Sequence, residues 1–301
     1  MVAEDEKAQP ASEDAKNIDE KKKETTEEKN ETRQHRYPRQ QNGQYHENRK
    51  NDGRDHNLQN EVDMSLDSGI TTEGILEVMP DGYGFIRCEN YLPGDGDVYV
   101  SPTQIRRFNL KTGDIVCGNT RIKTQGEKFS ALLYVRSVNG YHPSEAQKRT
   151  GFENLTPIFP NERIRLEYGR GVNMAMRIVD LVSPIGKGQR GMIVSPPKAG
   201  KTTLLKAVAK SIVHSNPNMH VIILLIDERP EEVTDIKEAI RGENVEVIYS
   251  TFDELPEHHK RVSEMVVERA KRLVEHHQDV TILLDSITRS EEHTSELQSR
   301  R

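Results

Sequence analysis

The chain has 301 residues, of which 31% are charged and 33% hydrophobic, and its net charge is −6. Residues 1–69 hold seventeen acidic and twelve basic side chains, so they carry five of the six net negative charges. The remainder is close to neutral, which excludes a chain-wide basic surface for nucleic acid, and any such site must be local.

The two cysteines, Cys88 and Cys117, are too few for a disulfide framework or a zinc site, and their apolar neighbours predict buried thiols. The N-terminus lacks an apolar signal region. The longest aliphatic run, residues 221–226, is too short to cross a bilayer. We therefore expect a cytoplasmic protein without a membrane partner.

Residues 1–69 are polar and of low complexity, so they cannot bury enough apolar surface to offset chain entropy. The front of this segment is acidic, whereas residues 33–54 are basic, with Tyr37 and Tyr45 interspersed. We expect a disordered tail that acts either as a solvated tether or as a weak, sequence-tolerant RNA-binding arm.

Residues 70–138 read as a small all-β domain. Five short apolar runs are separated by turns rich in Gly and Pro, which favours a five-stranded barrel. The expected strands are residues 73–79, 83–88, 97–100, 113–117 and 129–135.

Alternation along the second strand places Tyr83, Phe85 and Arg87 on one face and Ile86 on the other. Aromatic rings beside a cation on an outer strand face form a stacking platform for unpaired bases, which Tyr99 and Phe129 extend. The alternative is that these rings fill the barrel core.

Residues 139–175 contain several prolines without a regular period, so we expect an ordered connector. In residues 176–289, apolar runs alternate with amphipathic stretches, which predicts a parallel sheet covered on both faces by helices. The expected strands are 191–194, 221–226, 245–250 and 280–284, and the expected helices are 201–214, 231–241 and 257–275.

A phosphate-binding loop is the strongest motif. Residues 195–202 read Ser-Pro-Pro-Lys-Ala-Gly-Lys-Thr between the first of these strands and the first helix. Gly200 lets the backbone approach a phosphate, Lys201 would reach the β- and γ-phosphates, and the Thr202 hydroxyl would hold Mg²⁺. The alternative is a chance strand–turn–helix with a lysine at its end.

Two later strands end in acids, and the carboxyl ends of parallel strands are where such sheets bind ligands. Glu228 is the candidate for polarising an attacking water. Asp285 is the candidate for hydrogen-bonding the groups that bind Mg²⁺ directly. Arg229 would contact the nucleotide or a neighbouring subunit. Alternatively, Asp227, Glu228 and Arg229 form a local salt-bridged strand end.

Six segments together resemble the bacterial transcription termination factor Rho family: residues 82–87, 97–99, 101–110, 196–202, 225–233 and 282–289. The resemblance extends from about Gly74 to Arg289. It implies an OB or cold-shock-type barrel followed by a RecA-like P-loop ATPase domain. It also implies a homohexameric, RNA-dependent ATPase and helicase that translocates on nascent RNA and releases it from RNA polymerase.

The resemblance also implies site residues, with ATP and Mg²⁺ as cofactors. Its catalytic carboxylate maps onto Glu228, and Lys201 is the second catalytic candidate; the metal candidates, Thr202 and Asp285, come from the phosphate-loop and strand-end patterns described above. Its RNA site maps onto Gly82, Tyr83, Gly84, Phe85, Ile86, Arg87, Asp97, Val98, Tyr99, Glu127, Lys128 and Phe129. Its nucleotide site maps onto Gly186, Lys187, Gly188, Gln189, Arg190, Gly191, Lys198, Ala199, Gly200, Lys201, Thr202, Thr203 and Arg229.

The sequence departs from this family twice. The family's helical N-terminal subdomain is not visible, and after Arg289 the sequence stops following the family. Residues 290–301 look like a translated sequencing adapter, so we expect a non-native tail and a truncated ATPase domain. The missing part would carry the pore loops and an arginine finger. We therefore expect RNA binding without translocation, which leaves a non-translocating RNA- and nucleotide-binding module as the alternative function. A rotary-ATPase subunit is disfavoured by the aromatic platform.

Overall fold

The computed structural model describes residues 64–169, 173–196 and 198–286. Every described residue lies in one unit of the chain, residues 58–301. The predictions made for the polar tail up to residue 63 and for residues 290–301 lie outside the described residues.

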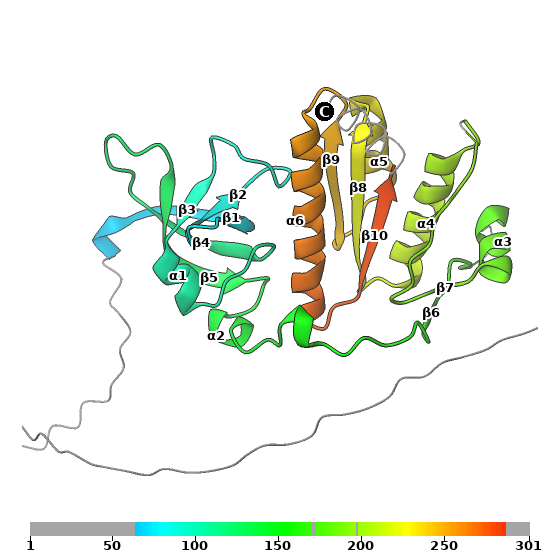
Figure 1. The fold of residues 1–301 in the computed structure, drawn as a ribbon, viewed down its shortest axis with the longest axis horizontal. Coiled ribbons are helices and arrows are strands. Elements are labelled where there is room, and N and C mark those ends of the chain that lie inside the picture. The colour runs from blue at the N-terminus through cyan, green and yellow to red at the C-terminus, as the bar shows by residue number, and fades with distance from the viewer. Residues whose placement is uncertain (1–63, 170–172, 197, 287–301) are drawn as a thin grey trace, which may run out of the picture. The chain divides into compact units, whose positions relative to one another are not determined.

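The first domain is a closed five-stranded barrel, which confirms the predicted fold (Figure 1). Its strands are β1 (Asp67–Val78), β2 (Gly84–Arg87), β3 (Val98–Val100), β4 (Ile115–Arg121) and β5 (Ser130–Val138), in the order β1-β2-β3-β5-β4. Only β3 and β5 run parallel. A 3-10 turn, η1 (Met64–Leu66), precedes β1, which begins at Asp67 and not at Glu73, where the sequence predicts the first strand to start.

The core of the barrel is aliphatic. It is closed at one end by α1 (Pro102–Arg107), which Ser101 and Gln104 cap reciprocally, and it also includes Ala146 of α2 (Pro143–Ala146). The buried core side chains are Leu76, Ile86, Val98, Val100, Ile105, Leu110, Val116, Leu132, Val135, Val138 and Ala146. Because the platform aromatics are not among them, the reading in which these rings fill the core is wrong.

The second domain is built on a three-stranded parallel sheet with β8 (His220–Glu228) between β9 (Val245–Thr251) and β10 (Val280–Asp285). Alternate residues of the buried strand β8 face opposite helical layers. Val221, Ile223 and Leu225 pack with α3 (Met174–Val182), α4 (Lys201–Ser215) and α5 (Pro230–Ala239), while Ile222, Leu224 and Ile226 pack against α6 (Pro256–Glu275). The predicted sheet with helices on both faces is confirmed (Figure 1).

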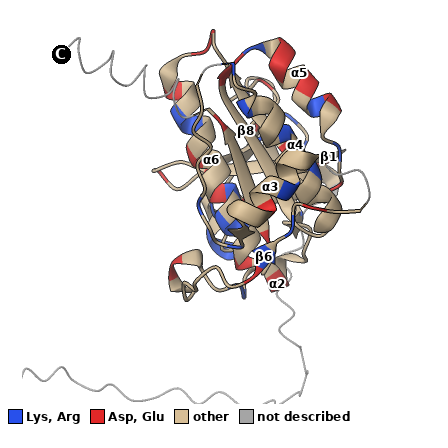
Figure 2. Cartoon of the chain, turned by 90° about the vertical axis from the view of Figure 1, so that its right-hand side faces the viewer, with Lys and Arg blue, Asp and Glu red and all other residues tan. Residues whose placement is uncertain are grey.

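The N-terminus of α5 follows ordinary helix electrostatics. The first turn of α5 is acidic, with Glu231 and Glu232, and Figure 2 shows red at this end of the helix. Acidic side chains there oppose the positive partial charge of the unpaired N–H groups. Among the described residues, no helix combines the length and hydropathy that a membrane span requires.

One predicted strand is absent. Residues 191–194 have no strand conformation, and Met192 and Val194 are 74% and 83% exposed. The chain instead pairs just before this segment, where β7 (Ile185–Gly186) meets β6 (Arg163–Ile164). An apolar run forms a buried strand only if a neighbouring strand satisfies its backbone hydrogen bonds. Within the described residues β10 pairs with β8 alone, so it gives residues 191–194 no such neighbour.

The expectation of buried thiols is wrong as well. Cys88 is exposed and Cys117 is half-buried. Cys88 lies just past the end of β2, so the alternation of the strand no longer applies to it, and its thiol donates to the Gly96 carbonyl at 3.4 Å.

The barrel packs on the second domain through β1, the loop after β2 and the connector, which includes η2 (Phe152–Asn154). Ile75 and Tyr91 join the apolar cluster of α6. The Asn90 side chain pairs with the backbone of Tyr249 in β9: Nδ2 donates to its carbonyl at 2.5 Å, and Oδ1 accepts from its N–H at 3.0 Å. The amide thereby substitutes for a neighbouring strand.

Candidate RNA and nucleotide sites

Four aromatic rings form a continuous cluster on the outside of the barrel. The centroid of Phe85 lies 5.8 Å from that of Tyr83, 6.0 Å from Tyr99 and 5.1 Å from Phe129. Strand register explains this arrangement, since Phe85 of β2 is the direct partner of Tyr99 in β3. The rings are half-buried, so each keeps part of its surface open for stacking. We call these four residues the aromatic platform.

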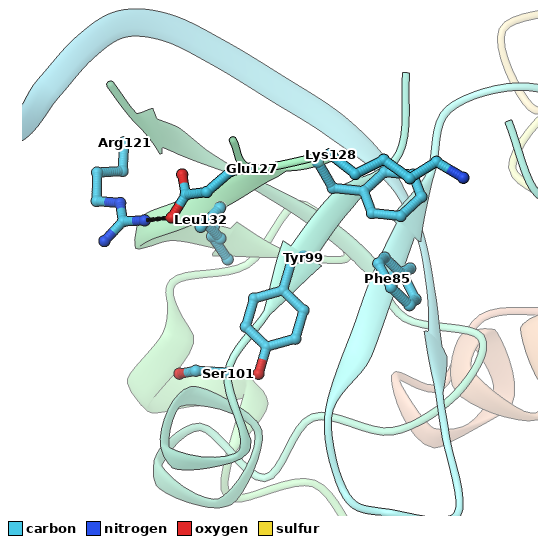
Figure 3. A pocket seen from close by; sticks show the side chains of 9 residues that line it. Phe85, Tyr99, Ser101, Arg121, Glu127, Lys128 and Leu132 are labelled. Atoms are coloured by element: carbon cyan, nitrogen blue, oxygen red, sulfur yellow. Dashed lines mark hydrogen bonds and ion pairs between the residues drawn. The ribbon is translucent and has the colours of Figure 1, made fainter. Parts of the chain in front are cut away.

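A pocket of about 470 Å³ opens beside the platform (Figure 3). Its lining residues are Phe85, Tyr99, Ser101, Arg121, Glu127, Lys128, Phe129, Ala131 and Leu132. The Lys128 ammonium lies 5.1 Å from the centroid of the Phe129 ring, which places a cation at the pocket. The predicted RNA residues include Phe85, Tyr99, Phe129, Glu127 and Lys128, whereas the other four lining residues, Ser101, Arg121, Ala131 and Leu132, were not among them.

Glu127 and Arg121 form an ion pair across the pocket, visible as the dashed contact in Figure 3. The pKa of Glu127 is lowered by the backbone N–H of Thr124 and by Arg121. The carboxylate therefore stays ionised and is oriented by its own loop. A fixed acceptor beside aromatic rings can receive hydrogen bonds from the exocyclic amino group of a base.

Arg87 underlies the aromatic platform instead of reaching into solvent. Its side chain is 5% exposed, and the guanidinium carbon lies 4.9 Å from the Phe85 centroid. It donates from Nε to Glu77 at 2.8 Å and from Nη1 to Asp97, which also accepts the Gly94 N–H at 3.0 Å. The cation is therefore held by two carboxylates behind the ring.

The predicted RNA residues Gly82, Gly84, Ile86 and Val98 present no side chain to the aromatic platform. Ile86 and Val98 point into the core, so only their backbone groups lie near the platform. Gly82 has a φ of +85° in the β1–β2 turn, which favours glycine. A Cβ on Gly84 would lie 2.9 Å from the Glu77 carbonyl, so this position is restricted by close strand packing.

The predicted phosphate loop leads into α4. The helix begins at Lys201, and its N-cap, Gly200, has a φ of +88° with open space around it, so conformation and not crowding selects glycine. Since Gly200 has no side chain, the first N–H groups of α4 are not capped by this residue and can bind an anion. Lys198 also has positive φ, at +62°.

The structure brings the two predicted metal partners together. The Thr202 hydroxyl donates to Asp285 Oδ2 at 2.9 Å, although 83 residues separate them in sequence. Asp285 ends β10 and is paired in register with Leu225 of β8. The carboxyl ends of these neighbouring strands therefore meet the first turn of α4, and a hydroxyl and a carboxylate are ligand types that suit Mg²⁺.

Glu228 ends β8 and is 3% exposed, next to Asp227, which is also buried. Arg229 is exposed and forms the N-cap of α5. Burial of two acids at a strand end is the environment expected for a group that orients water near a phosphate. The assignment of a catalytic role to Glu228 stays a prediction.

The Gly186–Gln189 segment forms a closed turn. The Gly186 N–H donates to the Gln189 side chain at 2.9 Å, and the Gln189 N–H donates back to the Gly186 carbonyl at 3.0 Å. Lys187 pairs with Asp279 at 2.7 Å and Glu162 at 2.6 Å, and these two contacts raise its pKa. Its charge is thus already balanced. The other predicted nucleotide residues of this region are exposed: Gly188, Arg190, Gly191, Lys198, Ala199 and Thr203.

Comparison with known families agrees with the two predicted domains. Residues 72–144 match the model of the Rho termination factor RNA-binding domain, and residues 175–301 match the nucleotide-binding domain of the ATP synthase alpha/beta family. A solved structure of the ATP synthase subunit NeqB from Nanoarcheaum equitans aligns at 19% identity with a TM-score of 0.36, covering 52% of this chain and 36% of that one. That likeness is too low to support an argument.

The curated relatives are more informative. Transcription termination factor Rho of Pseudomonas aeruginosa is 55% identical over 224 residues, which are 73% of this chain and 53% of the relative. The corresponding protein of Haemophilus influenzae is 56% identical over 220 residues, 72% of this chain and 52% of the relative. The chain spans about half the length of the curated relatives it matches. Both matched domains, in this order and at this identity, show that the chain belongs to the transcription termination factor Rho family.

Proposed function

We propose that this chain captures nascent RNA on its barrel and binds ATP on its sheet, as parts of an ATP-dependent RNA translocase that releases transcripts from RNA polymerase. One observation supports the proposal above the others. The same chain carries an open aromatic platform and a phosphate loop whose Thr202 is bonded to the acid that ends a neighbouring strand. The matched relatives are named as transcription termination factors.

For RNA, the proposal rests on exposed π-surface next to positive charge. Single-stranded bases stack on aromatic rings at about 1–3 kcal/mol per base, whatever their sequence. Lys128 supplies a cation next to the rings, where it could contact an RNA phosphate. Glu127 supplies a fixed hydrogen-bond acceptor for the edge of a base. A duplex hides its base faces, so the platform favours unpaired RNA.

For ATP, the proposal rests on the first turn of α4. Backbone N–H groups following Gly200 would bind phosphate oxygens, and Lys201 would neutralise their charge. The oxygens of Thr202 and Asp285 fit Mg²⁺, and this ion, when bound, would offset the negative charge of the phosphates. Glu228 would orient the attacking water, and Arg229, exposed after the carboxyl end of β8, would contact nucleotide or a neighbouring protomer of a homohexamer.

A second candidate, a module that binds RNA and nucleotide without translocating, is favoured by one structural feature. The exposed residues 191–194, which lead into the phosphate loop, are not held by the sheet. Within the described residues, no strand holds the chain where it enters the loop, and catalysis requires the reacting groups to be kept in a fixed geometry.

Two variants test the proposal. Lys201→Ala should abolish binding of a fluorescent ATP analogue and leave affinity for a single-stranded RNA unchanged, and Phe85→Ala should do the reverse. If Phe85→Ala leaves RNA affinity intact, the RNA site is elsewhere. RNA-stimulated ATP hydrolysis by the 301-residue chain would favour the translocase over the passive module, and its absence despite binding of both ligands would favour the module.

A further inference from the structure

An arginine of the nucleotide-binding domain is connected to the aromatic platform through two other charged side chains. Arg261 of α6 makes a bidentate contact with Glu77 of β1, from Nε to Oε1 at 2.9 Å and from Nη2 to Oε2 at 2.7 Å. Glu77 in turn accepts from Arg87 Nε at 2.8 Å. Since Arg87 lies against the Phe85 ring, three contacts connect helix α6 with the platform.

Strand register makes this connection possible. Glu77 of β1 is the direct partner of Phe85 in β2, so it lies on the same stretch of sheet as the platform. On α6, Arg261 is followed by Val262, which is fully buried in the cluster that covers one face of the sheet. The same turn of α6 therefore contacts both Glu77, next to the platform, and the apolar cluster that covers the sheet.

The charges of this group balance. Arg87 and Arg261 oppose Glu77 and Asp97, and the side-chain exposures are 5% for Arg87, 14% for Glu77 and 2% for Asp97. Arg261 is the most exposed member, at 35%. Without Arg261, one unit of negative charge would remain in a poorly solvated position directly behind a site for a polyanion.

We propose that Arg261 is a positioning residue for RNA binding: through Glu77 it fixes Arg87 against Phe85 and cancels the negative charge behind the platform. The inference rests on the proposed RNA function and deepens it, because it assigns to the nucleotide-binding domain a direct part in shaping the RNA site. Exposed ion pairs usually contribute little, but this one is bidentate and its acceptor is largely buried.

The test compares two substitutions on the same helix that remove the same charge. Arg261→Gln should weaken binding of a single-stranded RNA oligonucleotide about 5-fold. Lys260→Gln should change it less than about 2-fold, since Lys260 is 77% exposed and its ion pair is with Glu264 at 3.8 Å. Equal effects of the two substitutions would overturn the proposal.

The salt dependence separates positioning from direct contact. A cation that contacts phosphate lowers the slope of log Kd against log salt by about 1 when it is removed, whereas a positioning residue leaves the slope unchanged. A reduced slope for Arg261→Gln would therefore contradict the proposal. Thermal unfolding of each variant, measured in parallel, shows whether the fold is retained.

A second variant decides the question from the other side and does not depend on Arg261→Gln folding. Glu77→Gln removes a negative charge near a polyanion site, so simple electrostatics predicts tighter RNA binding. The proposal predicts weaker binding, because Arg87 loses its support, and it predicts that Arg261→Gln has no further effect in this background. Tighter binding would refute it.

The proposed function and this inference fail in different ways. If Phe85→Ala leaves RNA affinity unchanged, the platform is not the RNA site. If Phe85→Ala weakens binding while Glu77→Gln and Arg261→Gln match Lys260→Gln, the platform binds RNA and Arg261 does not position it.

Discussion

A buried ionic cluster at the end of α6 should be the most sensitive electrostatic feature of the fold. The Glu275 carboxylate is fully buried and forms ion pairs with Arg149 Nε at 2.8 Å and Arg272 Nη1 at 3.0 Å, and it accepts a hydrogen bond from Lys111 Nζ at 3.1 Å. It also accepts the Phe152 N–H at 2.9 Å. These partners come from the barrel, the connector and α6, so one carboxylate joins three segments.

The expected cost follows from burial. Glu275→Gln keeps the shape of the side chain but removes its negative charge. It also places the amide NH₂ group, a hydrogen-bond donor, against the cationic side chains. Arg149 and Arg272 are each 2% exposed, so neither can recover its solvation in water. Removing one partner of a buried ion pair typically costs about 3–5 kcal/mol, and we expect the low end of this range here, because Arg149 keeps Asp114 at 2.6 Å and Arg272 keeps Glu268 at 3.3 Å. With a urea m-value of about 2–3 kcal/mol/M, the unfolding midpoint should fall by about 1–2 M.

Urea unfolding followed by circular dichroism measures this shift. Lys260→Gln is the matched control, because its pair with Glu264 is exposed and should contribute about 0–1 kcal/mol. A midpoint for Glu275→Gln that coincides with the control would refute the reasoning.

Three further outcomes are expected. Thr202→Val should lose Mg²⁺-dependent binding of an ATP analogue while RNA affinity stays unchanged, and Thr202→Ser should retain both, as equilibrium titrations would show. Ile222→Ala, in the middle of β8, should cost about 2–5 kcal/mol in urea unfolding; a cost below 1 would mean that the strand is not buried. Burial, followed by nearby Arg149, lowers the pKa of His276, which stacks on Tyr141. The His276 imidazole therefore binds a proton more readily in the unfolded chain than in the folded one. The contribution of His276 to the free energy of unfolding should be constant above about pH 6.5 and should be lost as the pH falls below it. His276→Gln should flatten the dependence of the urea midpoint between pH 7 and pH 5, and an unchanged dependence would contradict the assignment.

Local pattern determined most of the secondary structure. Glycine and proline turns separated the five barrel strands, and helical periodicity marked α4, α5 and α6 near their observed limits. The period of two along β2 also separated Phe85, which faces outward, from Ile86, which lies in the core. These features depend on neighbours within a few residues, so a single sequence contains them.

Segment 191–194 shows where local pattern fails. Its apolar residues are typical of a buried strand, yet Met192 and Val194 are exposed. A helix satisfies its own backbone, whereas a strand needs hydrogen bonds from a neighbour that may be distant in sequence. Apolar composition therefore indicates a strand but does not supply the partner.

The functional sites divide in the same way. The sequence by itself determined which residues have the chemistry: aromatic rings at alternate positions, a glycine before Lys201, and acids after aliphatic strands. Only the tertiary structure decided their partners. It placed Thr202 on Asp285, buried Arg87 between Glu77 and Asp97, and brought Arg261 from another domain to the same carboxylate. The physical reason is that hydrogen bonds and ion pairs act over a few ångströms in space, and strand register and helix packing, not sequence separation, set which groups come that close.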